Sequence, residues 1–251
     1  MTAIDPKRLF DAVRAIKGKG LTQPEVDTIN AILAGAPLPL VPLTPREFIA
    51  GFIRAHEGAL SMRADDNGNW YDPARFKAGL PQRRNAGKLV GSKFGVTAYA
   101  VASFRDTADI TAADIAALTI EEAIDIGVHL YFDAPGFAKL PWDRVTASIV
   151  DKGWGSGPKT AIKMLQGLIG VGQDGKIGDL TVAADVDWRS TLGEEKAALA
   201  WAQRRIAFDT GIATNEGAKD PDRVFLKGWT NRTNSFLPGT PWWNAFYRRA
   251  A

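Results

Sequence analysis

Apolar residues recur at helical spacing along most of the chain, and many of these runs begin at a residue that can cap a helix. The strongest start is Thr44–Glu47, where a capping threonine precedes a first-turn proline and a glutamate three positions later. The apolar residues of 48–53 follow at spacings of three and four, which predicts one buried helical face. Because Gly58 suits the position that ends such a helix, we expect Glu57 to lie in its last turn.

Further helices are predicted on both sides of this one. Their expected starts share a capping residue or a first-turn proline, at Thr22, Thr111, Thr119 and Pro158. The helix that starts at Thr22 should pack against an earlier helix within 9–16 as a small hairpin. Two long amphipathic segments near the C-terminus should each bury a face: Leu199, Ala202 and Ile206 in the first, and Val224, Phe225, Trp229 and Phe236 in the second. The pair Trp242-Trp243 should dock the tail.

Two stretches interrupt this helical pattern. Residues 34–43 hold three prolines, which exclude a helix and favour an extended linker. Residues 61–97 are rich in Gly, Asn, Asp and Pro, so we expect them to be irregular or β-rich. The predicted fold class is α+β and predominantly helical. We expect a helical hairpin with a Pro-rich linker over 1–43, one domain over 44–155 and a second, helical domain over 156–251.

Composition excludes several classes of protein. The hydrophobic content of 45% is ordinary, and no apolar stretch approaches the ~20 residues that span a bilayer. Residues 1–8 lack the apolar core of a secretory signal. The absence of cysteine removes disulfides and thiol nucleophiles, and the two histidines, His56 and His129, leave little room for a metal centre. Since neither a zinc-protease helix nor a Gly-x-Ser-x-Gly elbow is present, we expect no metal and no cofactor.

The charge balance indicates the kind of partner. A net charge of +3 and a pI of about 9.1 suit association with an anionic polymer such as cell wall, a membrane surface or nucleic acid. The basic residues are interspersed with acidic ones and form no single stripe, which disfavours a nucleic-acid-binding protein.

Two carboxylates nine positions apart carry the candidate chemistry. Glycoside hydrolysis needs an acid that protonates the leaving oxygen and a second group that supports the cationic centre or activates water. The negative end of the helix dipole and the adjacent apolar stripe should raise the pKa of Glu57, which suits an acid. Asp66 lies in a polar, glycine-containing turn and should stay ionised. The neighbouring Asp65 could take the same second role.

The surrounding motifs resemble a known family. Ala55-His56-Glu57-Gly58, Asp66-x-Gly68 and Phe94-Gly95-Val96-Thr97 resemble the catalytic segment of glycoside hydrolase family 108. This resemblance implies a lysozyme-like fold, N-acetylmuramidase activity of the phage type, and Glu57 as the catalytic acid. Downstream, Gln173–Thr181 and Phe225–Arg232 resemble the predicted peptidoglycan-binding domain that follows the catalytic domain in that family. Together the matching segments cover about residues 47 to 237.

The chain also departs from the family pattern. Ala59-Leu60 replace a second glycine and an aromatic residue, and Trp70–Val90 intervene where family members pass almost directly to the next strand. Ser92-Lys93 replace a threonine and an asparagine. If the threonine hydroxyl of the family positions water or substrate, Ser92 could take its place, and Thr97 is the alternative.

Substrate contacts are expected in two places. The insertion mixes aromatic and basic residues, so Trp70 and Tyr71 could stack on sugar rings, or the insertion could be a surface excursion with its own small core. In the second domain, Asn231 and Arg232 could touch glycan strands. Helical spacing favours core packing for Trp229.

The sequence therefore predicts a monomeric peptidoglycan hydrolase that cleaves the β-1,4 bond between N-acetylmuramic acid and N-acetylglucosamine. Its partner would be bacterial peptidoglycan. As in a phage endolysin, it would be made in the host cytoplasm and reach the wall through a holin-like pore, or be carried in a virion. A lytic transglycosylase and a non-catalytic wall-binding protein remain as alternatives.

Overall fold

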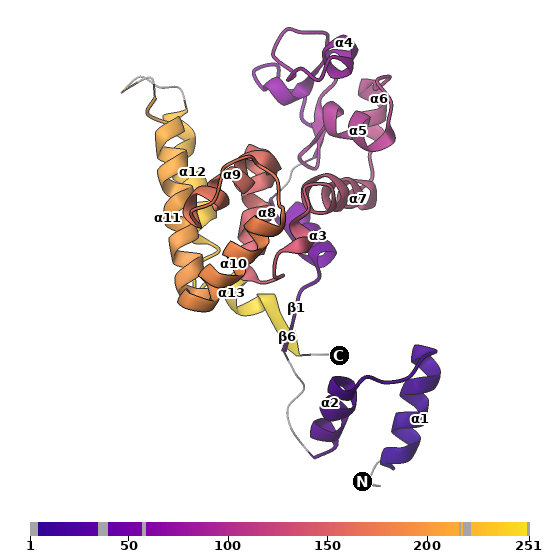
Figure 1. Ribbon diagram of the computed structural model, residues 1–251. Coiled ribbons are helices and arrows are strands. Elements are labelled where there is room, and N and C mark those ends of the chain that lie inside the picture. The colour runs from indigo at the N-terminus through magenta and orange to yellow at the C-terminus, as the bar shows by residue number, and fades with distance from the viewer. Residues whose placement is uncertain (1–4, 35–39, 57–58, 216, 218–221, 250–251) are drawn as a thin grey trace. The chain divides into compact units, whose positions relative to one another are not determined.

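The computed structural model describes residues 5–34, 40–56, 59–215, 217 and 222–249 (Figure 1). By its contacts the chain divides into two units, Met1–Pro42 with Tyr247–Ala251, and Leu43–Phe246. Helices dominate, and three two-stranded antiparallel sheets accompany them among the described residues. The predicted α+β, mainly helical fold class is confirmed.

The first unit holds the predicted hairpin. It comprises α1 (Pro6–Lys17) and α2 (Gln23–Leu33), followed by β1 (Leu40–Pro42), which pairs antiparallel with β6 (Tyr247–Arg249). An ion pair between Lys17 and Glu25 joins the two helices. No residue of α1 is fully buried: Leu9, Phe10 and Val13 are half-buried and Ile16 is exposed, since so small a unit can cover little apolar surface. The start of the predicted Pro-rich linker, residues 35–39, lies outside the described residues.

In the second unit, short elements follow one long helix. In chain order these are α3 (Pro45–His56), η1 (Asn67–Asn69), β2 (Trp70–Tyr71), α4 (Pro73–Lys77), β3 (Lys88–Leu89), β4 (Ser92–Lys93), β5 (Val96–Thr97), α5 (Ala98–Arg105), α6 (Ala112–Ala117) and α7 (Ile120–Val128). The strands form two small sheets, β2 with β3 and β4 with β5. The predicted irregular or β-rich character of 61–97 is confirmed.

A helical layer completes this unit. Its elements are η2 (His129–Asp133), η3 (Phe137–Lys139), α8 (Arg144–Ser156), α9 (Pro158–Leu168), α10 (Asp179–Leu192), α11 (Glu194–Ile212), α12 (Arg223–Asn234) and α13 (Pro241–Phe246). Helices α8, α9, α11 and α12 pack on one another (Figure 1). The predicted division between residues 155 and 156 falls in the last turn of α8, and it stays a prediction.

The predicted helix starts have the expected capping geometry. The Thr44 N–H donates to Glu47 Oε2 at 2.8 Å, and the Glu47 N–H donates to Thr44 Oγ1 at 3.2 Å. Thr22 and Thr111 form the same reciprocal pair of bonds, and Thr119 caps α7. Local side-chain bonds therefore fix where these helices begin.

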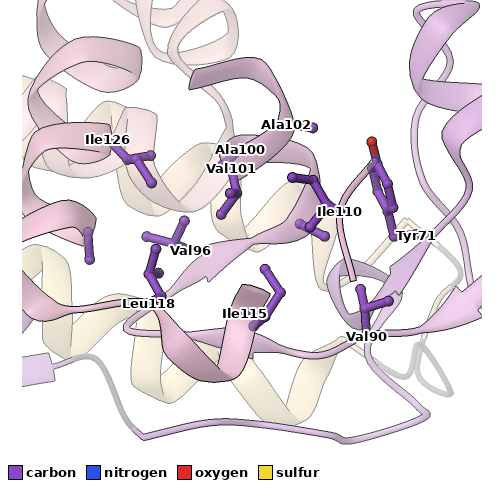
Figure 2. Packing of buried hydrophobic residues seen from close by; sticks show 12 residues of the cluster. Tyr71, Val90, Val96, Ala100, Val101, Ala102, Ile110, Ile115, Leu118 and Ile126 are labelled. Carbon is purple, nitrogen blue, oxygen red and sulfur yellow. The ribbon is translucent and has the colours of Figure 1, made fainter. Parts of the chain in front are cut away.

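The apolar residues of α3 are buried as predicted. A hydrophobic core beside the small sheets is made by Tyr71, Val90, Val96, Val101, Ile110, Ile115, Leu118 and Ile126, with several alanines (Figure 2). The core positions the strands that carry two of the candidate site residues, Ser92 and Thr97.

Two expectations about buried faces near the C-terminus are wrong in part. In α11, Ala202 is buried as predicted and Ile206 is half-buried, but Leu199 is exposed, because Trp201, Arg205 and Asp209 share the buried face. In the second segment, Phe236 is buried and Trp229 is half-buried, but Val224 and Phe225 are 77% and 53% exposed. The expectation for the tail is confirmed: Trp243 is buried, and Trp242 packs edge-on against Phe48 and Phe236.

The protein-facing side of α12 is polar instead of apolar. Thr233 is fully buried, and Arg232 reaches the buried carboxylate of Asp151 on α8. An ion pair to a buried carboxylate needs its partner to face inward, so the helix turns Val224 and Phe225 outward.

Candidate active site

The Asp66 turn is a rigid feature between α3 and the first small sheet. The Gly68 N–H donates to Asp66 Oδ1 at 2.8 Å, which makes Asp66 the N-cap of η1. The buried Asn69 holds the turn from below, since its Nδ2 donates to Ser61 Oγ at 3.2 Å and to the Arg63 carbonyl at 3.0 Å. The other carboxylate oxygen of Asp66 stays at an exposed edge of this turn.

The β4–β5 hairpin supplies the two hydroxyls. Ser92 lies directly opposite Thr97 in the antiparallel register, and Ser92 also bridges to Ser61 through backbone hydrogen bonds of 2.8 and 3.0 Å. Thr97 ends β5 and caps α5, where its Oγ1 accepts from the Ala100 N–H at 3.4 Å. Both side chains are half-buried.

Gly68 brings the turn and the hairpin together. A Cβ atom at this position would lie 3.0 Å from Thr97 Cγ2 and 3.3 Å from Asp66 Oδ1, closer than ordinary packing allows. A larger residue here would press on both side chains, so glycine favours the close approach of the turn to the hairpin. The structure thus places Asp66, Thr97 and its cross-strand partner Ser92 in one neighbourhood.

The predicted acid lies outside the described residues. Glu57 and Gly58 are not described, and of His56 only the backbone is, as the last residue of α3. The predictions that Glu57 ends this helix and has a raised pKa therefore remain predictions. Helix α3 itself is firmly placed, because Ile49 and Ile53 are in the core.

Asp65 differs from Asp66 in its partners. Arg63 donates to both oxygens of Asp65, from Nε at 3.1 Å and from Nη2 at 2.7 Å. These hydrogen bonds, with the charge of the guanidinium, hold the pKa of Asp65 below its usual value. Asp65 is thus neutralised by its own ion pair, which leaves Asp66 as the better candidate for the second carboxylate.

The two aromatic residues of the insertion face opposite sides of β2, as successive strand residues do. Trp70 is half-exposed, and its indole N–H donates to the Ala64 carbonyl at 2.9 Å, beside the Asp66 turn. Tyr71 is 1% exposed, and it lies in the core near Val90 and Ile110 (Figure 2). The prediction that Tyr71 stacks on sugar is wrong, because its ring has no free face.

Burial also affects the ionisation of the Tyr71 phenol. Its hydroxyl donates to the Ala108 carbonyl at 3.0 Å, and burial raises the pKa of Tyr71.

The rest of the insertion is anchored to this core. Phe76 of α4 packs against Tyr71 and Tyr99, with ring centroids 6.1 and 5.2 Å apart. At its far end, the Arg84 N–H donates to Asn67 Oδ1 at 2.9 Å, so the insertion touches the Asp66 turn. The exposed Arg84 therefore lies beside the candidate site.

The two predicted contacts on α12 have different surroundings. Asn231 is exposed. Arg232 pairs with Asp151 at 3.0 Å, and its guanidinium lies over the ring of Phe52 on α3, 4.4 Å from the centroid. The positive charge of Arg232 is thus matched within the protein, which gives this residue a structural task that the sequence did not reveal.

Among the described residues, no helix has the length and apolar character that crossing a membrane requires. Nor do the described side chains form a group of three or more His, Asp or Glu residues that could hold a metal ion.

A cavity among α8, α9, α11 and α12 was missed by sequence reasoning. It has a volume of about 420 Å³, and charged residues, Asp151 and Lys152 among them, line it together with Trp229. The sequence feature that could have indicated this cavity is a set of charged residues at positions of α8 and α11 that helical spacing assigns to the core.

Comparisons with known proteins agree with these motifs. The model of the family described as Glycosyl hydrolase 108 matches residues 50–157, and the model described as Predicted Peptidoglycan domain matches residues 160–234. The fold is similar to a solved structure titled "Structure of Brucella abortus SagA", with 25% sequence identity and a TM-score of 0.55. The similarity covers 75% of this chain and 90% of that one. No curated protein matches the chain.

Proposed function

Because this chain belongs to glycosyl hydrolase family 108, we propose that it cleaves the β-1,4 bond between N-acetylmuramic acid and N-acetylglucosamine. The family makes it a glycoside hydrolase, and the predicted peptidoglycan domain makes peptidoglycan its partner. The choice of bond is the proposal. It is supported by the order of the motifs, in which a glutamate, a turn aspartate and a hydroxyl-bearing strand follow one another.

In the proposed mechanism, Glu57 protonates the glycosidic oxygen as the sugar–oxygen bond breaks. A general acid must hold its proton near neutral pH, so a raised pKa is required of Glu57. Four positions separate Glu57 from Ser61, the residue that bridges to Ser92. This short connection supports assigning Glu57 to the same site as the hydroxyl-bearing hairpin.

Asp66 is the proposed second carboxylate. Its role is to stabilise the cationic sugar or to take a proton from the attacking water, and Ser92 or Thr97 would orient that water. The observation that supports this proposal is the close approach at Gly68, which has both the Thr97 methyl group and Asp66 Oδ1 as near neighbours. Arg63 hydrogen-bonds to both oxygens of Asp65 and not to Asp66, so the Asp66 carboxylate is the more available of the two.

Two candidate sugar contacts remain from the predicted set. Trp70 is half-exposed beside the Asp66 turn, and Asn231 is exposed on α12. We assign the catalytic part to residues 44–155 and wall binding to residues 156–251. The roles of a monomeric phage endolysin, released through a holin-like pore or carried in a virion, are supported by the family resemblance alone.

One observation favours a second function, that of a lytic transglycosylase. Asp66 Oδ1 caps its own turn by accepting the Gly68 N–H, as an aspartate with a purely structural task would do. A transglycosylase uses a single acid/base glutamate and no activated water, so it could dispense with Asp66.

Digestion of purified peptidoglycan, with the products reduced and identified by mass, separates these functions. We expect muramic acid at the reducible ends from the wild type, strong loss of product from Asp66→Asn and near-normal product from the matched variant Asp65→Asn. Anhydromuramic ends would instead establish the transglycosylase. A loss confined to Asp65→Asn would move the second role to that residue.

A further inference from the structure

Of the candidate catalytic residues that the structure describes, Asp66, Ser92 and Thr97, none lines the cavity among α8, α9, α11 and α12. Its volume of about 420 Å³ lies within the range of sites that hold small molecules. Each of the four helices contributes to the wall, for example Gly155 of α8, Thr160 of α9, Phe208 of α11 and Trp229 of α12.

The charges in the wall cancel. Three cationic and three anionic side chains line the cavity: Lys152, Arg205 and Arg232, and Asp151, Asp209 and Asp222. Asp151 accepts from Arg205 at 2.7 Å and pairs with Arg232 at 3.0 Å, and Lys152 pairs with Asp209. A charged ligand would enter a low-dielectric site without an uncompensated counter-charge, which is unfavourable. The cavity therefore suits a ligand that is polar but neutral.

Hydroxyl groups are available for such a ligand. Ser156 and Thr160 are half-buried in the cavity wall, and within the described part of the chain no hydrogen bond engages either hydroxyl. A hydroxyl can both donate and accept, so these two groups match sugar hydroxyls and acetamido groups equally well.

An aromatic surface continues the wall toward solvent. Trp229 stacks on Phe225, with ring centroids 5.9 Å apart and an interplanar angle of 26°. Phe225 is 53% exposed and takes no part in the core, so part of its ring is accessible to a ligand. Aromatic faces of this kind pack against the C–H faces of pyranose rings.

We propose that this cavity binds a neutral N-acetylhexosamine unit of a glycan strand. Trp229 and Phe225 form the stacking surface, and Ser156 and Thr160 hydrogen-bond to the sugar. The assignment of the sugar rests on the proposed function, since it takes peptidoglycan glycan as the source. A free stem peptide, which carries carboxylates and an ammonium group, is the competing ligand that the charge balance disfavours.

The test follows the Trp229 indole N–H by ¹⁵N NMR in the full chain carrying Glu57→Gln, so that the probe is not cleaved. The probe is the β-1,4-linked tetramer of N-acetylglucosamine, and Trp229→Phe assigns the signal. We expect a saturable shift of this signal. An unmoved Trp229 signal at saturating tetramer, or a shift with free stem tetrapeptide and none with tetramer, would overturn the proposal.

Two glycine substitutions provide a matched pair of variants. A side chain at Gly155 would grow from the cavity wall into open space, so Gly155→Gln should occlude the cavity without a clash and weaken binding at Trp229 about tenfold or more. Gly211 on α11 also has open space but does not line the cavity, so Gly211→Gln should bind as the parent does. Equal affinity of the two variants would contradict the proposal.

This experiment stands apart from the test of catalysis. If the wild type releases no product from peptidoglycan but the Trp229 signal shifts with tetramer, the proposed function fails and the binding site stands. If hydrolysis proceeds and the signal does not move, only the binding site fails.

Discussion

Asp151→Asn should destabilise the protein strongly, because it removes a negative charge on which two arginines depend. Asp151 and Arg205 have side chains that are 1% and 3% exposed, and they are 2.7 Å apart. Removing one partner of a buried ion pair costs about 3–5 kcal/mol, and the asparagine oxygen keeps one hydrogen bond, which favours the lower end. Arg232 is 31% exposed, so its share is screened and adds less than about 1 kcal/mol. We expect a loss of about 3 kcal/mol.

Urea denaturation followed by circular dichroism measures this loss. With a slope of about 3 kcal/mol per molar urea, the midpoint should fall by about 1 M. Asp187→Asn is the matched control, since the same change at an exposed position of α10 should alter stability by less than about 0.5 kcal/mol. If the two variants had the same midpoint, the ionic cluster would contribute nothing to the packing of α8, α11 and α12, and the reasoning would be refuted.

Two further predictions concern single positions. Gly87→Ala should lower the thermal midpoint far more than Gly79→Ala. Both glycines have positive φ, where alanine is strained by about 1 kcal/mol. Only at Gly87 would the added Cβ also clash with the backbone, 2.1 Å from the Tyr71 carbonyl oxygen. Equal midpoints would contradict this. Glu25 should titrate near pH 2 by NMR, because hydrogen bonds from Lys17 lower its pKa from 4.5 to about 2. The stabilisation that ionised Glu25 gives the α1–α2 hairpin is therefore complete above pH 4.5 and lost as the pH falls to about 2. A Glu25 titration near pH 4.5 in the wild type would refute this prediction.

Features that depend on neighbouring residues were predictable from the sequence. A threonine followed three positions later by an acidic residue specifies a helix start, and the structure has this geometry at Thr44 and Thr111. The buried face of α3 followed from apolar spacing, and the irregular character of 61–97 followed from its glycines and polar residues.

Features that depend on distant residues were not predictable. Trp70 and Tyr71 are adjacent aromatics on a short strand, and only the pairing with β3 and the core decides that Tyr71 faces inward. In α12 the apolar spacing was correct but its direction was not, because a carboxylate 81 positions away, on Asp151, draws Arg232 inward.

In the candidate site, too, the individual residues were predictable from the sequence and their proximity was not. Asp66 and Thr97 were each recognisable from their motifs, but their proximity depends on the glycine at position 68 and on the hairpin that carries Thr97. The insertion between them could have separated these residues. Its anchoring through Phe76 to Tyr71 and Tyr99 keeps the turn and the hairpin adjacent.

The most direct test of the proposed mechanism compares digestion of purified peptidoglycan by the wild type and by Glu57→Gln, with the products reduced and identified by mass. Sedimentation of each protein with the insoluble polymer is the control for folding. We expect muramic acid ends from the wild type, none from Glu57→Gln, and equal sedimentation of both proteins. Appreciable product from Glu57→Gln would contradict the assignment of Glu57 as the acid.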